Sequence, residues 1–105
     1  MIDLTTLTLI RQPERERTAV WGKWNREPRV LKSYAVALPD GTAIGRVFQD
    51  MTTFDIKPKG ARIVTRRWES PRWYAVAAGQ FRRGHPHETR KAALESLRYA
   101  AENPS

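Results

Sequence analysis

The 105-residue chain has no cysteine, only two histidines and no long run of apolar residues. Without cysteine, neither disulfides nor thiolate metal sites can form, which favours a reducing compartment and stability from packing alone. No segment approaches the roughly 20 apolar residues of a membrane span. The first ten residues carry an acidic Asp3 and several threonines, unlike a secretory signal. These features predict a cytoplasmic protein without a membrane partner.

Residue patterns that support catalysis are equally scarce. The six glycines are scattered singly, so no phosphate-binding glycine loop is present. His85 and His87 lie beside several arginines, which repel cations, and they would need a third ligand such as Glu88 to hold a metal ion. The aspartates fit turns as well as they fit paired-carboxylate catalysis. We therefore predict no enzyme, no catalytic residue, no metal and no cofactor.

The composition that remains is that of one globular domain. The chain is 40% hydrophobic and 29% charged, and its length suits a single core. Alternating strand patterns and turn signals predict an α+β fold, in which an antiparallel sheet of about four to six strands packs against one C-terminal helix. The expected segments are an edge strand at 1–10, a basic connection at 11–29, one hairpin at 30–49, a second at 61–78, and a helix at 88–101.

The hairpin at 30–49 has the clearest signals. A strand from Val30 to Leu38 runs into Pro39-Asp40-Gly41-Thr42, in which proline presets φ, aspartate bonds its own backbone and glycine accepts positive φ. The returning arm is expected to place Ile44 and Phe48 on its apolar face.

The second hairpin is expected to have arms at 61–68 and 72–78, turned by Glu69-Ser70-Pro71. The helix that follows has His87 or Thr89 as its N-cap and stops at Asn103-Pro104. The two hairpins share an echo, because Tyr34-Ala35-Val36-Ala37 recurs as Tyr74-Ala75-Val76-Ala77. Duplication of a hairpin unit and coincidence of strand composition both account for it.

The net charge of +8 is concentrated in three blocks. Residues 11–32 hold seven basic side chains against three acidic ones, residues 57–72 hold six against one, and residues 81–91 hold four against one. Such blocks suit a polyanionic partner, because each neutralised phosphate releases condensed counterions. A solvated surface that keeps the protein soluble is the other interpretation.

Arginine and tryptophan occur together in two of these blocks. Arginines on a strand face can bind phosphates or guanine edges, and indoles can stack on bases. With a period of two, Arg62, Arg66 and Trp68 would share one face. The alternative is that the indoles form the core and the arginine stems cover its rim. The candidate nucleic-acid-binding residues are Trp21, Lys23, Trp24, Arg26, Arg29, Arg62, Arg66, Arg67, Trp68 and Arg72.

Two resemblances bear on function. Trp21-Gly22-Lys23-Trp24 resembles a tetrapeptide in the first strands of plant AP2-type DNA-binding domains, and a sheet followed by one packing helix is also the layout of AP2 and integrase amino-terminal domains. That resemblance covers four residues and implies a sheet laid in the major groove of DNA. Over residues 30–101 the chain is similar in style to small orphan proteins of actinobacteria and their phages, which implies no activity.

Two functional hypotheses follow. The first is a non-enzymatic nucleic-acid-binding module, favouring double-stranded DNA. The second is a phage or bacterial protein-interaction factor that binds and modulates an acidic host protein, because tryptophan and arginine are also favoured at protein interfaces. Either could be a homodimer through the N-terminal strand, since an apolar edge strand is a template for pairing.

Overall fold

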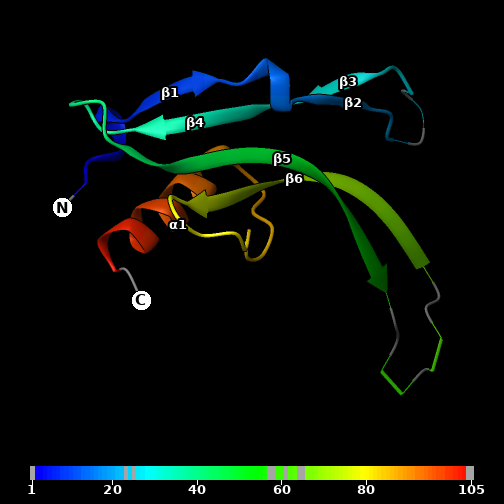
Figure 1. Cartoon of the computed structure of the whole chain (residues 1–105). Helices are drawn as coiled ribbons and strands as arrows, with labels where there is room; N and C mark the ends of the chain where they lie inside the picture. Colours follow the sequence, from blue (N-terminus) through cyan, green and yellow to red (C-terminus); the bar gives the residue numbers. More distant parts are fainter. Residues whose placement is uncertain are drawn as a thin grey trace.

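The structure is a computed structural model that describes residues 2–22, 24, 26–56, 59–60, 62–63 and 66–103, with the side chains of residues 56 and 66 left out. It confirms the α+β fold: a four-stranded antiparallel sheet, a two-stranded sheet and one C-terminal helix (Figure 1). The elements in chain order are η1 (Leu4–Thr6), β1 (Thr8–Arg11), η2 (Pro13–Arg15), β2 (Arg17–Ala19), β3 (Arg29–Leu31), β4 (Ser33–Ala37), β5 (Ala43–Ile56), β6 (Arg66–Ala77) and α1 (Arg90–Glu102).

Two long strands extend beyond the rest of the sheet. The strand order is β1-β4-β5-β6, and β4 pairs with β5 only as far as Ser33 opposite Phe48. Past that point β5 and β6 continue as a two-stranded ribbon of seven residue pairs, from Asp50 opposite Arg72 to Ile56 opposite Arg66, which curves away from the body (Figure 1). The radius of gyration of 16.1 Å exceeds the roughly 13 Å of a compact 100-residue domain, so the molecule is elongated.

Helix α1 covers one face of the sheet. Thr89 is its N-cap and accepts a hydrogen bond from the Ala92 N–H at 3.1 Å, which confirms one of the two predicted caps. Ala93 and Leu97 of α1 are fully buried against Val36 and Val47. The close approach depends on Gly45, because a Cβ at this position would lie 2.6 Å from Leu97 Cδ1.

The predicted turn at residues 39–42 is confirmed. Asp40 Oδ1 accepts a hydrogen bond from the Thr42 N–H at 2.8 Å, and Gly41 has φ of +92°. The returning arm differs from the expectation in one respect. The pairing of β4 with β5 shifts by one residue around Ile44, which joins the core under α1, whereas Phe48 lies on the opposite face. An inserted residue reverses the alternation of faces, so the two side chains do not share an apolar face.

The predicted second hairpin at 61–78 is wrong, because β6 is continuous through Glu69-Ser70-Pro71 and pairs along its whole length with β5. Proline is tolerated because β6 is an edge strand here. The Trp73 N–H points away from β5 and donates to the His87 carbonyl at 2.8 Å. Pro71, two residues earlier, has the same orientation, so its missing N–H falls on the outer edge.

The N-terminal segment also differs from the expected strand over residues 1–10. Asp3 accepts a hydrogen bond from the Thr5 N–H at 2.9 Å and caps η1, which takes up Leu4–Thr6. The strand β1 is therefore shorter, and it lies at the edge of the sheet beside β4. The segment expected as a connection over 11–29 holds η2 and β2, which pairs with β3. Pairing of the β1 edge with a second copy stays a prediction.

Candidate functional site

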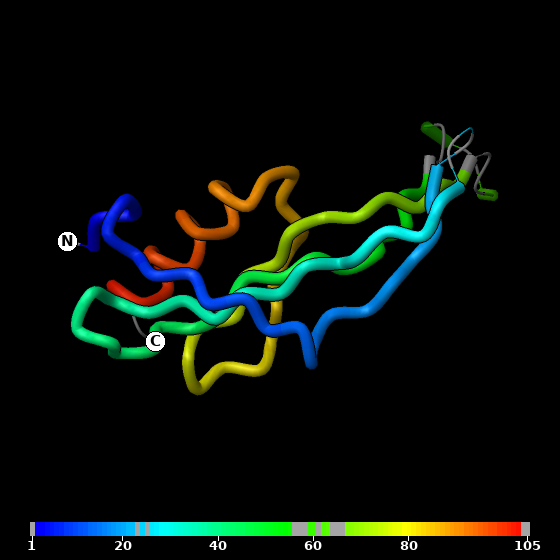
Figure 2. Tube along the Cα trace, turned by 90° about the horizontal axis from the view of Figure 1, so that it is seen from above, coloured from blue at the N-terminus to red at the C-terminus, as the bar shows by residue number. Residues whose placement is uncertain are grey.

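The face of the sheet opposite α1 carries arginine and aromatic side chains. Seen along the sheet, α1 lies on one side, while η2 and the segment that follows β6 project on the other (Figure 2). The strand register places alternate residues of β5 and β6 on this second side. We call it the arginine–aromatic face: Arg46, Phe48, Asp50, Thr52 and Phe54 of β5, Trp68, Arg72 and Tyr74 of β6, and the side chains of Arg17 and Arg83, which reach it from neighbouring segments.

The aromatic rings of this face are stacked in cross-strand pairs. Phe48 and Tyr74 have ring centroids 5.8 Å apart, and Phe54 and Trp68 have centroids 5.2 Å apart, with interplanar angles of 23° and 20°. Tyr74 is almost completely buried, and its hydroxyl lies 2.6 Å from the Thr52 hydroxyl. The rings therefore form a fixed platform on the sheet.

Guanidinium groups lie over these rings. The Arg46 guanidinium carbon is 4.4 Å from the centroid of Phe48, that of Arg83 is 4.2 Å from Tyr74, and that of Arg72 is 4.7 Å from Phe54. Cation–π attraction and planar stacking restrict each guanidinium to a layer above its ring. The platform thus holds three positive groups in place.

One carboxylate lies among these cations. Asp50 forms ion pairs with both Arg17 and Arg83 and also accepts a hydrogen bond from the Met51 N–H at 2.9 Å. Burial works to raise the pKa of Asp50, but the hydrogen bonds from Arg83 and Arg17 outweigh it and hold the pKa below its ordinary value. Arg17, Arg46, Arg72 and Arg83 against this single carboxylate leave the face with an excess of positive charge.

The structure brings together only some of the predicted site residues. Trp68, which is 40% exposed, and Arg72 both belong to the arginine–aromatic face. Arg67 projects on the opposite face and pairs with Asp55 at 2.7 Å. The backbone of Arg66 begins β6, but its side chain lies outside the description, and Arg62 is exposed in the connection between β5 and β6.

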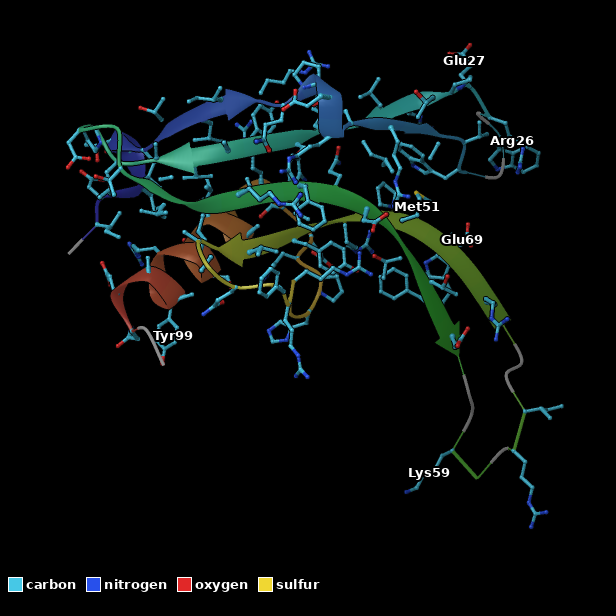
Figure 3. All side chains as sticks on the ribbon, in the orientation of Figure 1. Arg26, Glu27, Met51, Lys59, Glu69 and Tyr99 are labelled. Carbon is cyan, nitrogen blue, oxygen red and sulfur yellow. The ribbon has the colours of Figure 1, made fainter. Side chains whose placement is uncertain are left out.

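The other predicted residues lie in the connection between β2 and β3. Trp21 is half-buried beneath the Arg29 guanidinium, whose carbon is 4.5 Å from the ring centroid. Trp24 is 89% exposed, and Arg26 donates to the Gly22 carbonyl at 3.3 Å. Lys23 lies outside the described residues. Arg26 and Lys59 mark the ends of the two connections at the end of the molecule away from α1, but β2–β3 and the ribbon diverge there (Figure 3).

Three arginines of this face, Arg17, Arg46 and Arg83, were not among the site residues predicted from the sequence. Arg17 and Arg83 belong to the basic blocks, but both were expected in solvated connections. Arg46 stands outside every basic block and lies within the body of the sheet, opposite Ala35 of β4. The signal that could have found it is the alternation of Arg46 with Phe48 along one strand.

The histidine pair lies beside the sheet edge. The rings of His85 and His87 are 5.7 Å apart, and burial, with a smaller effect of His85, lowers the pKa of His87. In the described part of the chain, no group of three or more histidine, cysteine, aspartate or glutamate side chains is arranged to hold a metal ion.

No family model matches the chain, and no curated protein or solved structure matches it significantly. None of the described helical residues forms a helix with the length and apolar character needed to cross a bilayer.

Proposed function

We propose that this domain is a non-enzymatic nucleic-acid-binding module that uses the arginine–aromatic face, with double-stranded DNA as its preferred ligand. The observation that carries the proposal is the layer of three guanidinium groups held over stacked rings. A guanidinium binds phosphate oxygens or the O6 and N7 atoms of guanine through two parallel hydrogen bonds. Holding it in place lowers the entropy lost on binding.

The covered rings favour a duplex over a single strand. Binding of single strands relies on bases that stack on open aromatic rings. Here the rings of Phe48, Tyr74 and Phe54 already lie under arginines. At these three rings the guanidinium groups, and not the ring faces, are therefore what the arginine–aromatic face offers to a ligand.

The ribbon supports the same preference. Its seven residue pairs span about 23 Å at roughly 3.3 Å per residue, and a major groove about 12 Å wide admits a two-stranded β-ribbon. Acidic side chains indicate which side would face the DNA. Asp55 and Glu69 project on the side opposite Trp68 and Arg72, whereas Asp50, on the same side as Arg72, is paired with Arg17 and Arg83. The arginine–aromatic side is therefore the less repulsive one.

A matched pair of substitutions on β6 tests this proposal. Arg72→Gln and Arg67→Gln each remove one positive charge, but the two side chains lie on opposite faces. We expect Arg72→Gln to weaken duplex binding about tenfold, as expected for one charged hydrogen bond, and to reduce the salt slope of log K by about 0.9. Arg67→Gln should change affinity less than about twofold, because its charge is already paired with Asp55.

The measurement is fluorescence anisotropy with a labelled duplex and a labelled single strand of equal length, over a series of salt concentrations. Equal losses for the two variants would mean that bulk charge alone drives binding, which contradicts a face-specific site. Absence of binding to either ligand at micromolar protein and low salt contradicts the proposed function altogether. Tighter binding of the single strand would contradict the duplex preference.

The alternative proposal is a factor that binds an acidic host protein. It rests on Trp24 and Phe81, which are 89% and 98% exposed, because large exposed aromatic side chains are typical anchors of protein interfaces. A pull-down from nuclease-treated lysate separates the two proposals. Recovery of one acidic protein at fixed stoichiometry that is lost in Trp24→Ala and Phe81→Ala favours the protein partner, whereas loss of all partners after nuclease treatment favours nucleic acid.

A further inference from the structure

A second feature of the arginine–aromatic side lies away from the ribbon, over the body of the sheet, where β5 pairs with both β4 and β6. A hollow of 230 Å³ opens there between η2 and the turn that follows β6. Its floor is apolar, formed in part by Ala35 and Val76, and its polar rim is formed by Gln12, Arg15, Arg46 and Gln80.

The two arginines of the hollow have no acidic partner among the described residues. No carboxylate of the described residues forms an ion pair with Arg15 or Arg46, and no acidic residue lines the hollow. Arg46 is half-buried and is held over Phe48. Burial, and then the positive charge of Arg15, lower the pKa of Arg46. Two guanidinium groups therefore face one space in which no carboxylate of the described chain neutralises them, an arrangement that an anion would stabilise.

The neutral groups of the rim are also hydrogen-bond donors. Ser33 donates its hydroxyl to Gln12 Oε1 at 3.2 Å, which leaves the Gln12 amide nitrogen as the group without an acceptor among the described residues. The side chain of Gln80 adds a second amide to the rim. The backbone N–H of Gln80 donates to the Ala77 carbonyl at 3.0 Å. The rim thus combines two cations with two amide donors around a concave surface.

We propose that this hollow is a binding site for a phosphate group, held by Arg15 and Arg46. A phosphate offers three or four acceptor oxygens and up to two negative charges, which matches two guanidinium forks and two amides better than a carboxylate does. The group could belong to a small phosphorylated molecule, to a strand terminus or to a nucleic-acid backbone. The inference goes beyond the proposed function, because it adds Arg15 and a concave site for a single phosphate group, although Arg46 belongs to both the hollow and the arginine–aromatic face.

The test is a titration of the folded full chain with inorganic phosphate at neutral pH and constant ionic strength, followed by the Nε–Hε resonances of its arginines in ¹H–¹⁵N spectra. We expect saturable shifts at Arg15 and Arg46 and in the backbone amides of residues 78–80, with acetate binding more weakly. Arg15→Gln should raise the dissociation constant about tenfold, as expected for one charged hydrogen bond. Arg15 is exposed on η2, so this variant should fold.

Arg26→Gln is the matched control, because it removes the same charge from the distant β2–β3 connection and should leave the dissociation constant within about twofold. Arg46→Lys keeps the charge but loses the planar fork, and it should give an intermediate loss. Absence of saturable shifts at Arg15 and Arg46, or an equal loss in Arg26→Gln, would overturn the proposal.

Parallel titrations with oligonucleotides identify which kind of molecule supplies the phosphate group. A 5′-hydroxyl oligonucleotide that shifts Arg15 and Arg46 indicates a backbone phosphate, whereas a shift only with the 5′-phosphorylated form indicates a terminal one. Saturable binding of inorganic phosphate with no response to any oligonucleotide supports a site for a small phosphorylated molecule, even if nucleic-acid binding itself fails. If duplex binding depends on Arg72 but inorganic phosphate does not shift the Arg15 resonance, only the phosphate site in the hollow is overturned, and the proposed function stands.

Discussion

The two faces of the four-stranded sheet are packed in different ways. Under α1, small residues such as Ala77 and Ala93 let the helix lie close, and Leu97 is 1% exposed. On the other face, rings lie on the strands and guanidinium groups lie over the rings. The first face excludes water and stabilises the fold. The second keeps charge at the surface while its aromatic layer is packed, which suits the binding role proposed for it.

The repeated tetrapeptide shows how position decides which of these faces a residue joins. Tyr34 pairs with Val47 of β5, and Tyr74 pairs with Phe48. Because Val47 and Phe48 are adjacent in one strand, their partners project on opposite faces. Tyr34 stacks on Trp73 beside α1, whereas Tyr74 is buried under Arg83. The two copies are therefore not structurally equivalent, although their sequences are identical.

The largest expected effect is on the helix-covered face, at Gly45. A Cβ at this position would lie 2.3 Å from the Val76 carbonyl oxygen and 2.6 Å from Leu97 Cδ1, and φ is +148°. We expect Gly45→Ala to lower the free energy of unfolding by about 3 kcal/mol through overpacking and backbone strain. Urea denaturation measures it. Gly41→Ala is the control, because φ is +92° there but nothing lies within 4 Å, so it should lose only about 1 kcal/mol.

The next largest effect on stability is expected on the arginine–aromatic face, at Asp50. The hydrogen bonds from Arg83 and Arg17 lower its pKa in the folded state, so its stabilisation is present above the ordinary pKa of 3.8 and is lost as pH falls through the lower folded pKa. Asp50→Asn should lower the free energy of unfolding at neutral pH by about 1 to 2 kcal/mol.

Urea denaturation as a function of pH measures this effect. The difference between wild type and Asp50→Asn should shrink below pH 3.8. If the difference in free energy of unfolding stayed constant down to strongly acidic pH, the charge of Asp50 would not stabilise its contacts with Arg17 and Arg83. Asp55→Asn is the control, because Asp55 is more exposed and has a single arginine partner, so its loss should be smaller.

A smaller effect is expected at the hydroxyl of Tyr74. Tyr74→Phe keeps the ring under Arg83 but removes the hydrogen bond to Thr52, so the free energy of unfolding should fall by about 1 kcal/mol or less. Thermal unfolding followed by circular dichroism detects the change. Tyr99→Phe, at a side chain that is 70% exposed, should have no measurable effect. An equal loss in both variants would contradict the role of the buried hydroxyl.

The smallest effect on stability is expected at Trp24. Its side chain is 89% exposed, so Trp24→Ala should change the free energy of unfolding by less than about 0.5 kcal/mol. Trp73→Ala should cost about 3 kcal/mol or more, because Trp73 packs against the core beneath α1. Chemical denaturation of both variants checks this contrast. A large loss at Trp24 would place it in the folded core and remove it as an anchor for a partner.

Local signals predicted much of the fold. The turn at Asp40-Gly41 and the Thr89 cap depend on side chains that bond their own neighbouring backbone, so they can be recognised in a short stretch of sequence. The break expected at Pro71 failed for the opposite reason. Whether a proline ends a strand depends on which side its nitrogen faces, and this is decided by the partner strand and by the sheet edge.

The candidate site divides in the same way. The sequence by itself determined that the chain is basic, free of cysteine and built of alternating strands with a final helix, because composition and periodicity are local properties. Only the tertiary structure decided which arginines meet. Arg17, Asp50 and Arg83 are brought together by strand pairing and by the segment that folds back after β6, and the pairing of β5 with β6 places Asp55 beside Arg67 on the opposite face. Contacts between residues distant in the chain depend on register, and a one-residue change of register exchanges the faces.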